Sequence, residues 1–350
     1  QEQTWLDATL PSDTVPMVGD VDADGKADLI LWGSSSGQWH VARSTGSRFT
    51  APSTWHSGFG AGQTPFMGDF NGDQLLDVGT VKDGLWQMAR STGGGFTGPT
   101  TWLSGFGAGQ TPLTGDFNGD GLTDVAAASG GTVSVALSTG SALTAQPAAW
   151  ATSFGSGQTL TSADINGDGL TDVLYYDKSS GTGMSAFSTG QGFGSSQALM
   201  SEHPFSLRGS DDRFQVGDFG GKALSGFGVF NAISGAAEIV FALGTPPDLL
   251  AGVANGLGGN SHITYTASTA FDHTNEEGAP TLPFVLPVVA QVETSDGLGQ
   301  TYATTYRYRG GVYDGPTREF RGFRAGTVSD AVGTTTETTF SQDEHTKGRP

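Results

Sequence analysis

An acidic motif that recurs at a nearly constant period constrains this chain more than any other feature of its sequence. Four segments share the pattern D-x-[DN]-x-D-[GQ]-x-x-D, and their leading aspartates lie 49, 47 and 48 residues apart. These aspartates are Asp20, Asp69, Asp116 and Asp164. A weaker fifth copy begins at Asp218, 54 residues further on. Such a period indicates a repeat architecture in which each unit packs mainly against its neighbours.

Other landmarks keep the same period. The phrases ARSTG, ARSTG, ALSTG and AFSTG follow the four motifs, and FALGT at 241–245 is interpreted as the fifth copy. A tryptophan precedes each strong motif by 14 or 15 residues, and these are Trp5, Trp55, Trp102 and Trp150. Apolar and polar residues alternate between glycine-rich turns, which favours short strands over helices. We therefore predict an all-β fold, a β-propeller with about five visible blades in an incomplete ring, and the tryptophans at the seams between blades.

Each strong motif places oxygen ligands at positions 1, 3, 5 and 9, with the carbonyl of position 7 between them. Hard cations such as Ca²⁺ take six to eight oxygens in a flexible cage. An EF-hand would need a glutamate at position 12 and flanking helices, whereas position 12 here is Leu31, Thr80, Ala127 or Tyr175. We predict about four structural Ca²⁺ ions in β-propeller loops. The predicted ligands are Asp20, Asp22, Asp24, Lys26 and Asp28; Asp69, Asn71, Asp73, Leu75 and Asp77; Asp116, Asn118, Asp120, Leu122 and Asp124; and Asp164, Asn166, Asp168, Leu170 and Asp172.

Solvated turns are the alternative interpretation of these loops, because Asp, Asn and Gly favour turns in any case. Four copies in register, each with three or four carboxylates within nine residues, would repel strongly without a cation, which favours ion binding. Gln74 replaces the glycine at position 6 of the second loop and is expected to strain that site. In the fifth copy Gly220, Lys222 and Gly226 replace ligands, so no ion is predicted there.

Composition argues against several classes of function. The formal net charge of −19 argues against nucleic acid and anionic membranes as partners, and no apolar run approaches the roughly 18 residues of a membrane helix, so no membrane insertion is expected. Cysteine is absent, which removes disulfides and thiolate chemistry. The S-T-G serines lack a nucleophile-elbow motif and are interpreted as turn serines. His273, beside Glu276 and Glu277, is interpreted as part of an exposed loop, so no enzyme is predicted.

The repeat pattern ends near Thr245, which predicts a propeller over residues 1–245 and a different β-domain over residues 246–350. Strand-like alternation follows at 262–266, 302–308 and 334–340. Because the chain opens in repeat sequence and ends without a terminal cap, we expect it to be a piece of a longer protein with its second domain truncated.

Three segments of this second region carry a specific resemblance. They are DLLAGVANGLGGNSHITYTAST at 248–269, LPFVLPVVAQVETSDGLG at 282–299 and YRYRGGVYDGPTREFRGF at 306–323. They resemble the middle/N-terminal region of TcdB/SpvB-type insecticidal toxins, the B components of bacterial Tc toxins and their Rhs-like relatives. The upstream repeats resemble the FG-GAP/VCBS blades that precede this region in the same proteins.

The resemblance implies a non-catalytic scaffold of a secreted toxin. In that family the propeller docks onto a pore-forming partner, and the following β-sheet begins an Rhs-type shell. The implied partners are therefore the pore-forming subunit and the remainder of the shell. The implied location is extracellular, and SpvB-type relatives also act in the host cytoplasm.

An integrin-like or lectin-like adhesion propeller that binds glycan or a host surface is the second hypothesis. A lectin would be expected to repeat an aromatic residue on a blade-top loop. Trp39 and Trp86 recur three residues before the ARSTG phrases, but Val133 and Gly183 take this place in the next two units. The sequence therefore gives only a weak glycan-binding signal.

Overall fold

The computed structural model describes residues 5–7, 10–152, 159–198, 205–221, 224–231, 233–240, 249–274, 281–282, 284–314, 317, 319–343 and 345–349. Strands make up its regular structure apart from one 3-10 turn, η1 (Ser268–Ala270), which confirms the all-β prediction. Within these ranges no helix has the length and apolar character needed to cross a membrane.

The chain forms two compact units, which are described separately. The first comprises Gln1–Ile165, Gly169–Gly217 and Phe227–Val240, and the second comprises Asn166–Asp168, Asp218–Gly226 and Phe241–Pro350. The predicted boundary between residues 245 and 246 lies within 241–248, outside the described residues, as does the FALGT phrase. The domain boundary therefore stays a prediction.

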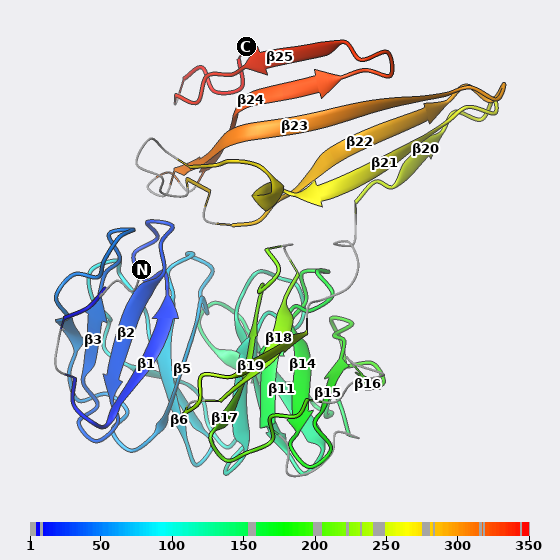
Figure 1. Ribbon diagram of the computed structural model, residues 1–350. Helices are drawn as coiled ribbons and strands as arrows, with labels where there is room; N and C mark the ends of the chain where they lie inside the picture. The colour runs from blue at the N-terminus through cyan, green and yellow to red at the C-terminus, as the bar shows by residue number, and fades with distance from the viewer. Residues whose placement is uncertain are drawn as a thin grey trace. The chain divides into compact units, whose positions relative to one another are not determined.

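The first unit is a β-propeller segment of five antiparallel sheets, each a blade (Figure 1). Strand order in every blade follows the sequence, and the first strands β5, β9, β13 and β17 contact one another in turn. Blades one and two are β1 (Thr14–Gly19), β2 (Asp28–Gly33), β3 (Trp39–Ala42), β4 (Ser53–His56), and β5 (Thr64–Gly68), β6 (Asp77–Lys82), β7 (Leu85–Ala89), β8 (Thr100–Leu103). Blades three and four are β9 (Thr111–Gly115), β10 (Asp124–Ser129), β11 (Thr132–Ser138), β12 (Leu143–Ala145), and β13 (Thr159–Ala163), β14 (Asp172–Asp177), β15 (Thr182–Ala186), β16 (Gln197–Ala198). The fifth blade is β17 (Asp212–Gly217), β18 (Gly226–Asn231) and β19 (Ala237–Val240).

Aromatic side chains fill the seams between blades. Trp55 of the first blade contacts Phe96 of the second, with ring centroids 5.1 Å apart, and Trp150 contacts Phe193 of the fourth blade at 5.7 Å. Trp102 is buried in the cluster shared by the second and third blades. The seam prediction is therefore confirmed for three of the four tryptophans. Trp5 makes the equivalent contact with Phe49 of the first blade at 5.6 Å, but no described strand precedes it and it is 39% exposed.

Two further tryptophans form the deepest part of the core. Trp39 and Trp86 are 0% and 1% exposed, and their indole N–H groups donate to the carbonyls of Phe59 (3.1 Å) and Phe106 (2.9 Å). These carbonyls belong to the glycine-rich linkers between blades, so each indole fixes a linker to its blade. Since both rings are buried, neither can offer a face to a sugar.

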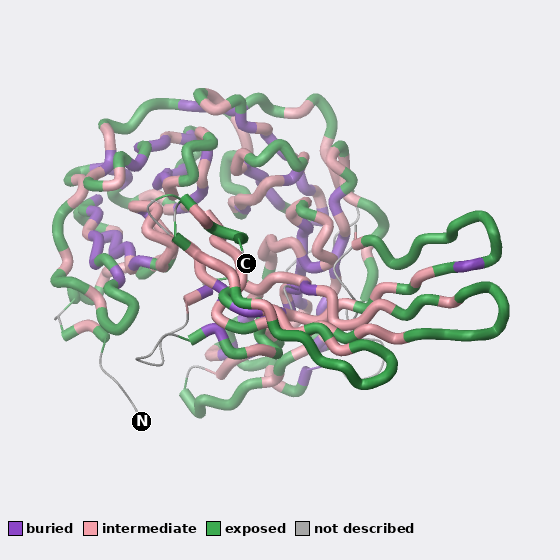
Figure 2. Tube along the Cα trace, turned by 90° about the horizontal axis from the view of Figure 1, so that it is seen from above, coloured by how far each residue is buried: buried purple, intermediate pink, exposed green. Residues whose placement is uncertain are grey.

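The second unit holds one six-stranded antiparallel sheet (Figure 1). Its strands, in order, are β20 (Gly252–Ala254), β21 (Asn260–Ala267), β22 (Pro287–Ser295), β23 (Thr301–Asp314), β24 (Glu319–Ser329) and β25 (Thr335–Thr339). The strands predicted at 262–266 and 302–308 fall within β21 and β23, and the strand predicted at 334–340 contains β25 and extends one residue beyond each of its ends. Figure 2 shows buried residues concentrated in the propeller blades, whereas exposed residues dominate the long hairpin turns.

His273 corrects one sequence interpretation. The side chain is only 8% exposed, whereas an exposed loop was expected. Its Nδ1 accepts the Gly311 N–H (2.9 Å), its Nε2 bonds the Ser268 carbonyl (3.0 Å), and its ring packs on Phe323. The polar sequence around His273 hid this role, because Gly311 and Phe323 belong to strands that lie 38 and 50 residues away. Glu276 and Glu277 lie outside the described residues.

Candidate metal centres

The aspartate at position 9 of each acidic loop begins the second strand of its blade and is fully buried. Each carboxylate accepts two backbone N–H groups from its own blade. Oδ2 accepts from the residue at position 2 at 3.1–3.3 Å, and Oδ1 accepts from the S-T-G serine at 2.7–2.8 Å. The four sets are Asp28 with Val21 and Ser44, Asp77 with Phe70 and Ser91, Asp124 with Phe117 and Ser138, and Asp172 with Ile165 and Ser188.

Burial dominates the electrostatics of these carboxyl groups. It raises the pKa of Asp28 to about 6 and the pKa values of Asp77 and Asp124 to about 7, because a charged group loses its hydration. The backbone N–H bonds oppose this rise, whereas the other aspartates of the loop add to it. Each loop therefore holds a buried carboxyl group, and a bound cation would stabilise the ionised form of that group.

The other acidic residues fold each loop back on itself. In all four loops the position-1 carboxylate accepts the N–H of position 6 at 2.6–2.9 Å. In the first three, the position-5 carboxylate accepts the N–H of position 7 at 2.9 Å. These bonds draw the side-chain oxygens of positions 1 and 5 against the loop backbone, and each carboxylate oxygen keeps a second lone pair for another partner.

The first loop brings three predicted ligands together. Oxygens of Asp20, Asp22 and Asp28 all lie within 4.8 Å of one another. Asp24 instead pairs with Lys26 Nζ at 2.7 Å. Burial, followed by the charge of Asp24, raises the pKa of Asp22. Three carboxylates this close fit a divalent cation with oxygen ligands, because it would relieve both their mutual repulsion and their desolvation.

The later loops carry an asparagine at position 3. Its Nδ2 donates to the position-5 carboxylate at 2.9–3.0 Å, as in Asn71 to Asp73, Asn118 to Asp120 and Asn166 to Asp168. Amide and carboxylate oxygens remain a donor set that suits Ca²⁺. In the fifth copy, Gly220 and Gly226 supply no side-chain oxygen, and Lys222 lies outside the described residues.

The S-T-G serines have a role that the sequence interpretation missed. Ser91, Ser138 and Ser188 are 4–5% exposed, and each hydroxyl donates at 2.7 Å to the position-2 carbonyl of the preceding blade. The acceptors are Val21, Phe70 and Phe117 respectively. A second bond crosses each seam, from the position-8 N–H to the position-1 carbonyl of the preceding blade: Leu76 to Asp20 (3.1 Å), Thr123 to Asp69 (2.7 Å) and Thr171 to Asp116 (2.6 Å). In the sequence, this role is indicated by the recurrence of the serine at the same place in all four strong repeats.

Gln74 has the left-handed φ of 66° that its position requires, as expected from the glycines at the same place in the other loops. Gly121, the equivalent residue of the third loop, has φ of 83°. A Cβ added at Gly121 would meet nothing within 4 Å, so a larger residue there faces only the conformational cost. The two loops thus form a matched pair.

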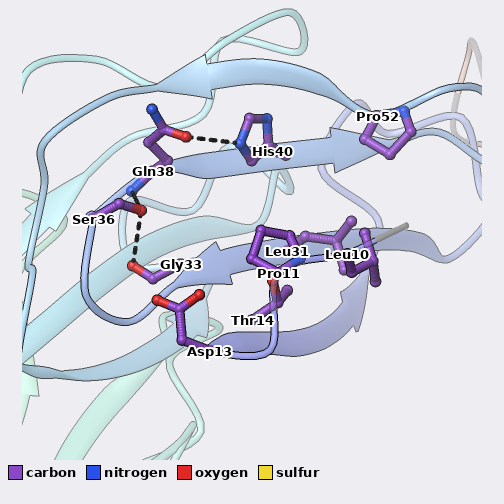
Figure 3. A pocket seen from close by; sticks show the side chains of 10 residues that line it. All are labelled: Leu10, Pro11, Asp13, Thr14, Leu31, Gly33, Ser36, Gln38, His40 and Pro52. Atoms are coloured by element: carbon purple, nitrogen blue, oxygen red, sulfur yellow. Dashed lines mark hydrogen bonds between the residues drawn. The ribbon is translucent and has the colours of Figure 1, made fainter. Parts of the chain in front are cut away.

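The first blade carries a pocket of about 280 Å³ (Figure 3). Its polar side chains are already engaged. Gln38 Oε1 bonds His40 Nε2 at 3.3 Å, and Asp13 accepts the N–H of Ser35 at 2.9 Å. Hydrogen bonds from Ser35 also lower the pKa of Asp13. The residues that line this pocket therefore present no paired acid and base.

Comparison with known families assigns most of the chain. Residues 186–349 match the family described as insecticide toxin TcdB middle/N-terminal region. The FG-GAP-like repeat family matches residues 20–80, 69–127 and 116–175, and each of these windows runs from one acidic loop into the next. The two matches follow one another along the chain, the FG-GAP-like repeats first and the match to the TcdB middle/N-terminal region after them. The TcdB match begins in the fourth blade, so it includes the fifth blade, whose loop lacks ligands.

Solved structures share the fold of this chain. A Photorhabdus luminescens Tc holotoxin pore aligns with a TM-score of 0.72 and 19% identity, over 96% of this chain and 17% of that chain. A TcdB2-TccC3 crystal structure aligns with a TM-score of 0.55 and 18% identity, over 95% and 20%. A lectin of Agrocybe aegerita that recognises terminal N-acetylglucosamine aligns with a TM-score of 0.51 and 21% identity, over 66% of both chains. The chain thus spans about a fifth of the matched toxin chains, and a search of curated sequences found no match.

Replacing Gln74 by glycine is expected to raise the free energy of unfolding by about 1 kcal/mol, because a non-glycine residue in the left-handed region costs roughly 1–2 kcal/mol. The reciprocal change Gly121→Gln is expected to lower it by a similar amount. Urea unfolding of both variants measures the two differences. A change of the same sign in the free energy of unfolding of both variants would contradict this expectation.

In excess EDTA, the free energy of unfolding is expected to fall as the pH rises from about 4 to about 7. Unfolded aspartates ionise near pH 3.9, whereas the buried carboxyls of Asp28, Asp77 and Asp124 hold their protons up to about 6 or 7. The folded state therefore binds more protons across this window and loses stability with rising pH. Urea unfolding at a series of pH values measures the slope, and a free energy that rises across this window would refute it.

Proposed function

We propose that this chain is a non-catalytic scaffold segment of a secreted bacterial toxin of the Tc or Rhs type. Its propeller is stabilised by calcium and docks onto a partner subunit. The observation that carries the proposal is the union, in one chain, of four ligand-bearing FG-GAP-like blades with a TcdB-type sheet. The family match and the toxin fold support this reading together, since fold alone does not determine function.

The partners proposed are the pore-forming subunit and the remainder of the shell. The second unit supports the shell role because its sheet has long strands, with 14 residues in β23 and 11 in β24, and both strands continue through a bulge. Strands of this length suit a wall better than a small independent domain. The net charge of −19 supports a protein partner over nucleic acid or an anionic membrane.

Calcium is proposed to hold the position-1, -3, -5 and -9 side chains of the four strong loops, together with the position-7 carbonyl. When bound, the ion supplies positive charge and coordination to oxygens that otherwise repel. The chain's own residues do the rest, because the position-9 aspartate anchors the loop to its blade and the position-1 and position-2 carbonyls tie it to the next blade. The proposed role of calcium is therefore structural.

An adhesion propeller that binds glycan remains the second candidate, and the lectin alignment over 66% of each chain favours it. The burial of Trp39 and Trp86 removes the aromatic residues that suggested a sugar platform. Any sugar site would have to use other residues, so the scaffold function ranks first.

Calcium is expected to raise the thermal midpoint of the EDTA-treated chain, with about four ions bound by calorimetric counting. At a free concentration 100 times its Kd, each ion adds about 2.7 kcal/mol of stability. Asp73→Asn in the second loop is expected to remove one ion. Asp83→Asn, in the turn between β6 and β7, is the control and should leave the count unchanged. No midpoint shift and no bound ion would remove calcium from the proposal.

Docking is tested by mixing the chain with the pore-forming subunit of a Tc toxin and separating the mixture by size. We expect co-elution in millimolar Ca²⁺ and weaker co-elution in EDTA, because loops without their ions would leave the blades less ordered. Separate elution under both conditions would refute the docking role while leaving the calcium sites intact.

A further inference from the structure

The hydrogen bonds of the acidic loops join into one continuous relay through four blades. Asp28 accepts the Val21 N–H, the Val21 carbonyl accepts the Ser91 hydroxyl, and the Ser91 N–H donates to Asp77. The same three steps repeat along the chain. From Asp77 the relay continues through Phe70 and Ser138 to Asp124. From Asp124 it continues through Phe117 and Ser188 to Asp172. Asp172 then accepts the Ile165 N–H.

The relay runs through the interior of the unit. Its four aspartates, Val21, Phe70 and Phe117 are 0% exposed, and the three bridging serines are 4–5% exposed. Water therefore cannot replace a broken bond, and each group left unpaired would bear its full desolvation cost. A change at one loop is for this reason transmitted to its neighbour more readily than it would be at a solvated surface.

The bridging carbonyl lies inside the proposed ion site. Val21 stands between the proposed ligands Asp20 and Asp22, Phe70 between Asp69 and Asn71, and Phe117 between Asp116 and Asn118. Fixing the side chains at positions 1 and 3 fixes the peptide between them. The direction of the position-2 carbonyl then fixes the serine of the next blade, and with it the next position-9 aspartate.

The fifth repeat provides a natural comparison. Gly226 takes the place of the position-9 aspartate, and the FALGT phrase at 241–245 contains no serine. The two components of the relay are thus missing from the same repeat, although they are separate in sequence and only the aspartate is a proposed ligand. The residues of this phrase lie outside the described part of the chain.

We propose that Ser91, Ser138 and Ser188 are positioning residues that couple each acidic loop to the next, so that the four loops bind calcium cooperatively. This inference rests on the proposed calcium function. An ion that orders one loop also orders the backbone on which the next site is built, and the next ion then meets a smaller ordering cost. Coupling of this kind is reciprocal, so an ion at either loop of a pair favours the other.

Electrostatics alone predicts the opposite behaviour. Each bound Ca²⁺ lowers the negative potential that attracts the next ion, which disfavours successive binding. Without the relay, the four sites should therefore bind independently or with negative cooperativity. A Hill coefficient above one would need a structural connection between the loops, and the serine hydroxyls supply one.

The test is a set of calcium isotherms on the full chain, with Ser138→Ala and Ser44→Ala compared with the unchanged protein. Ser138→Ala removes the hydroxyl bond to Phe70 and divides the relay into two pairs. Ser44 makes the same local contact, accepting the N–H two residues on, at 3.2 Å against 3.1 Å for Ser138. Among the described residues, its hydroxyl has no acceptor in another blade, which makes Ser44→Ala the matched control.

We expect a Hill coefficient above one for the unchanged chain and for Ser44→Ala, and a coefficient closer to one for Ser138→Ala with the same number of ions. The affinity at the third loop is expected to rise at least about fivefold when the second is filled, the lower range of typical coupling. If Ser138→Ala folds poorly, Ser91→Ala and Ser188→Ala interrupt the relay at its other joints.

Hydrogen exchange gives a second measurement that does not depend on binding at the reporting loop. In an Asp120→Asn chain, whose third loop is disabled, calcium should still protect the amide at position 138 from exchange. Adding Ser138→Ala should abolish that protection. Cooperative binding that survives Ser138→Ala, or non-cooperative binding in the unchanged chain, would overturn the coupling alone. The absence of any calcium binding would instead overturn the proposed calcium function and the coupling with it.

Discussion

The buried carboxylate at position 9 is the constraint on which the rest of the propeller depends. It is fully buried, so each of its two oxygens needs a hydrogen-bond donor. The backbone N–H of position 2 donates to one oxygen, and the backbone N–H of the S-T-G serine donates to the other. An asparagine could not replace it, because its NH₂ group would face one of these N–H donors. This explains why all four loops keep Asp at position 9, whereas three of them carry Asn at position 3.

Satisfying this carboxylate also shapes the seam between blades. The second-strand start, the loop and the S-T-G turn must meet at one end of the blade, and the next blade must approach closely enough to bond them. Gly115, at the end of β9, permits that approach, since a Cβ there would lie 2.3 Å from the Thr171 side chain. The backbone bond from Thr171 to Asp116 forms across the same gap. Glycine thus occurs where the backbones of two neighbouring blades approach most closely.

Much of this arrangement could be predicted from the sequence, because its signals are local and periodic. The acidic period indicated blades, the alternation indicated strands, and the motif named the groups that gather in the first loop. The serines could not be assigned in the same way, since a turn serine and a seam serine have the same local sequence. The partners Ser138 and Phe70 are 68 residues apart, and only the stacking of blades brings them together. The burial of His273, Trp39 and Trp86 could not be predicted for the same reason.

The seam bonds give the row of blades a direction. The second and third blades each offer two carbonyls to the next blade and donate one hydroxyl and one backbone N–H to the preceding blade, so their two sides are complementary to each other. A duplicated repeat inserted into the row would therefore meet the partners it needs on both sides without any new mutation. A repeat that has lost the aspartate and the serine, as the fifth has, lacks two groups of the relay. Lengthening such a propeller by duplication is therefore an easy evolutionary step, whereas losing one serine within the row would remove one of the two hydrogen bonds that join neighbouring loops.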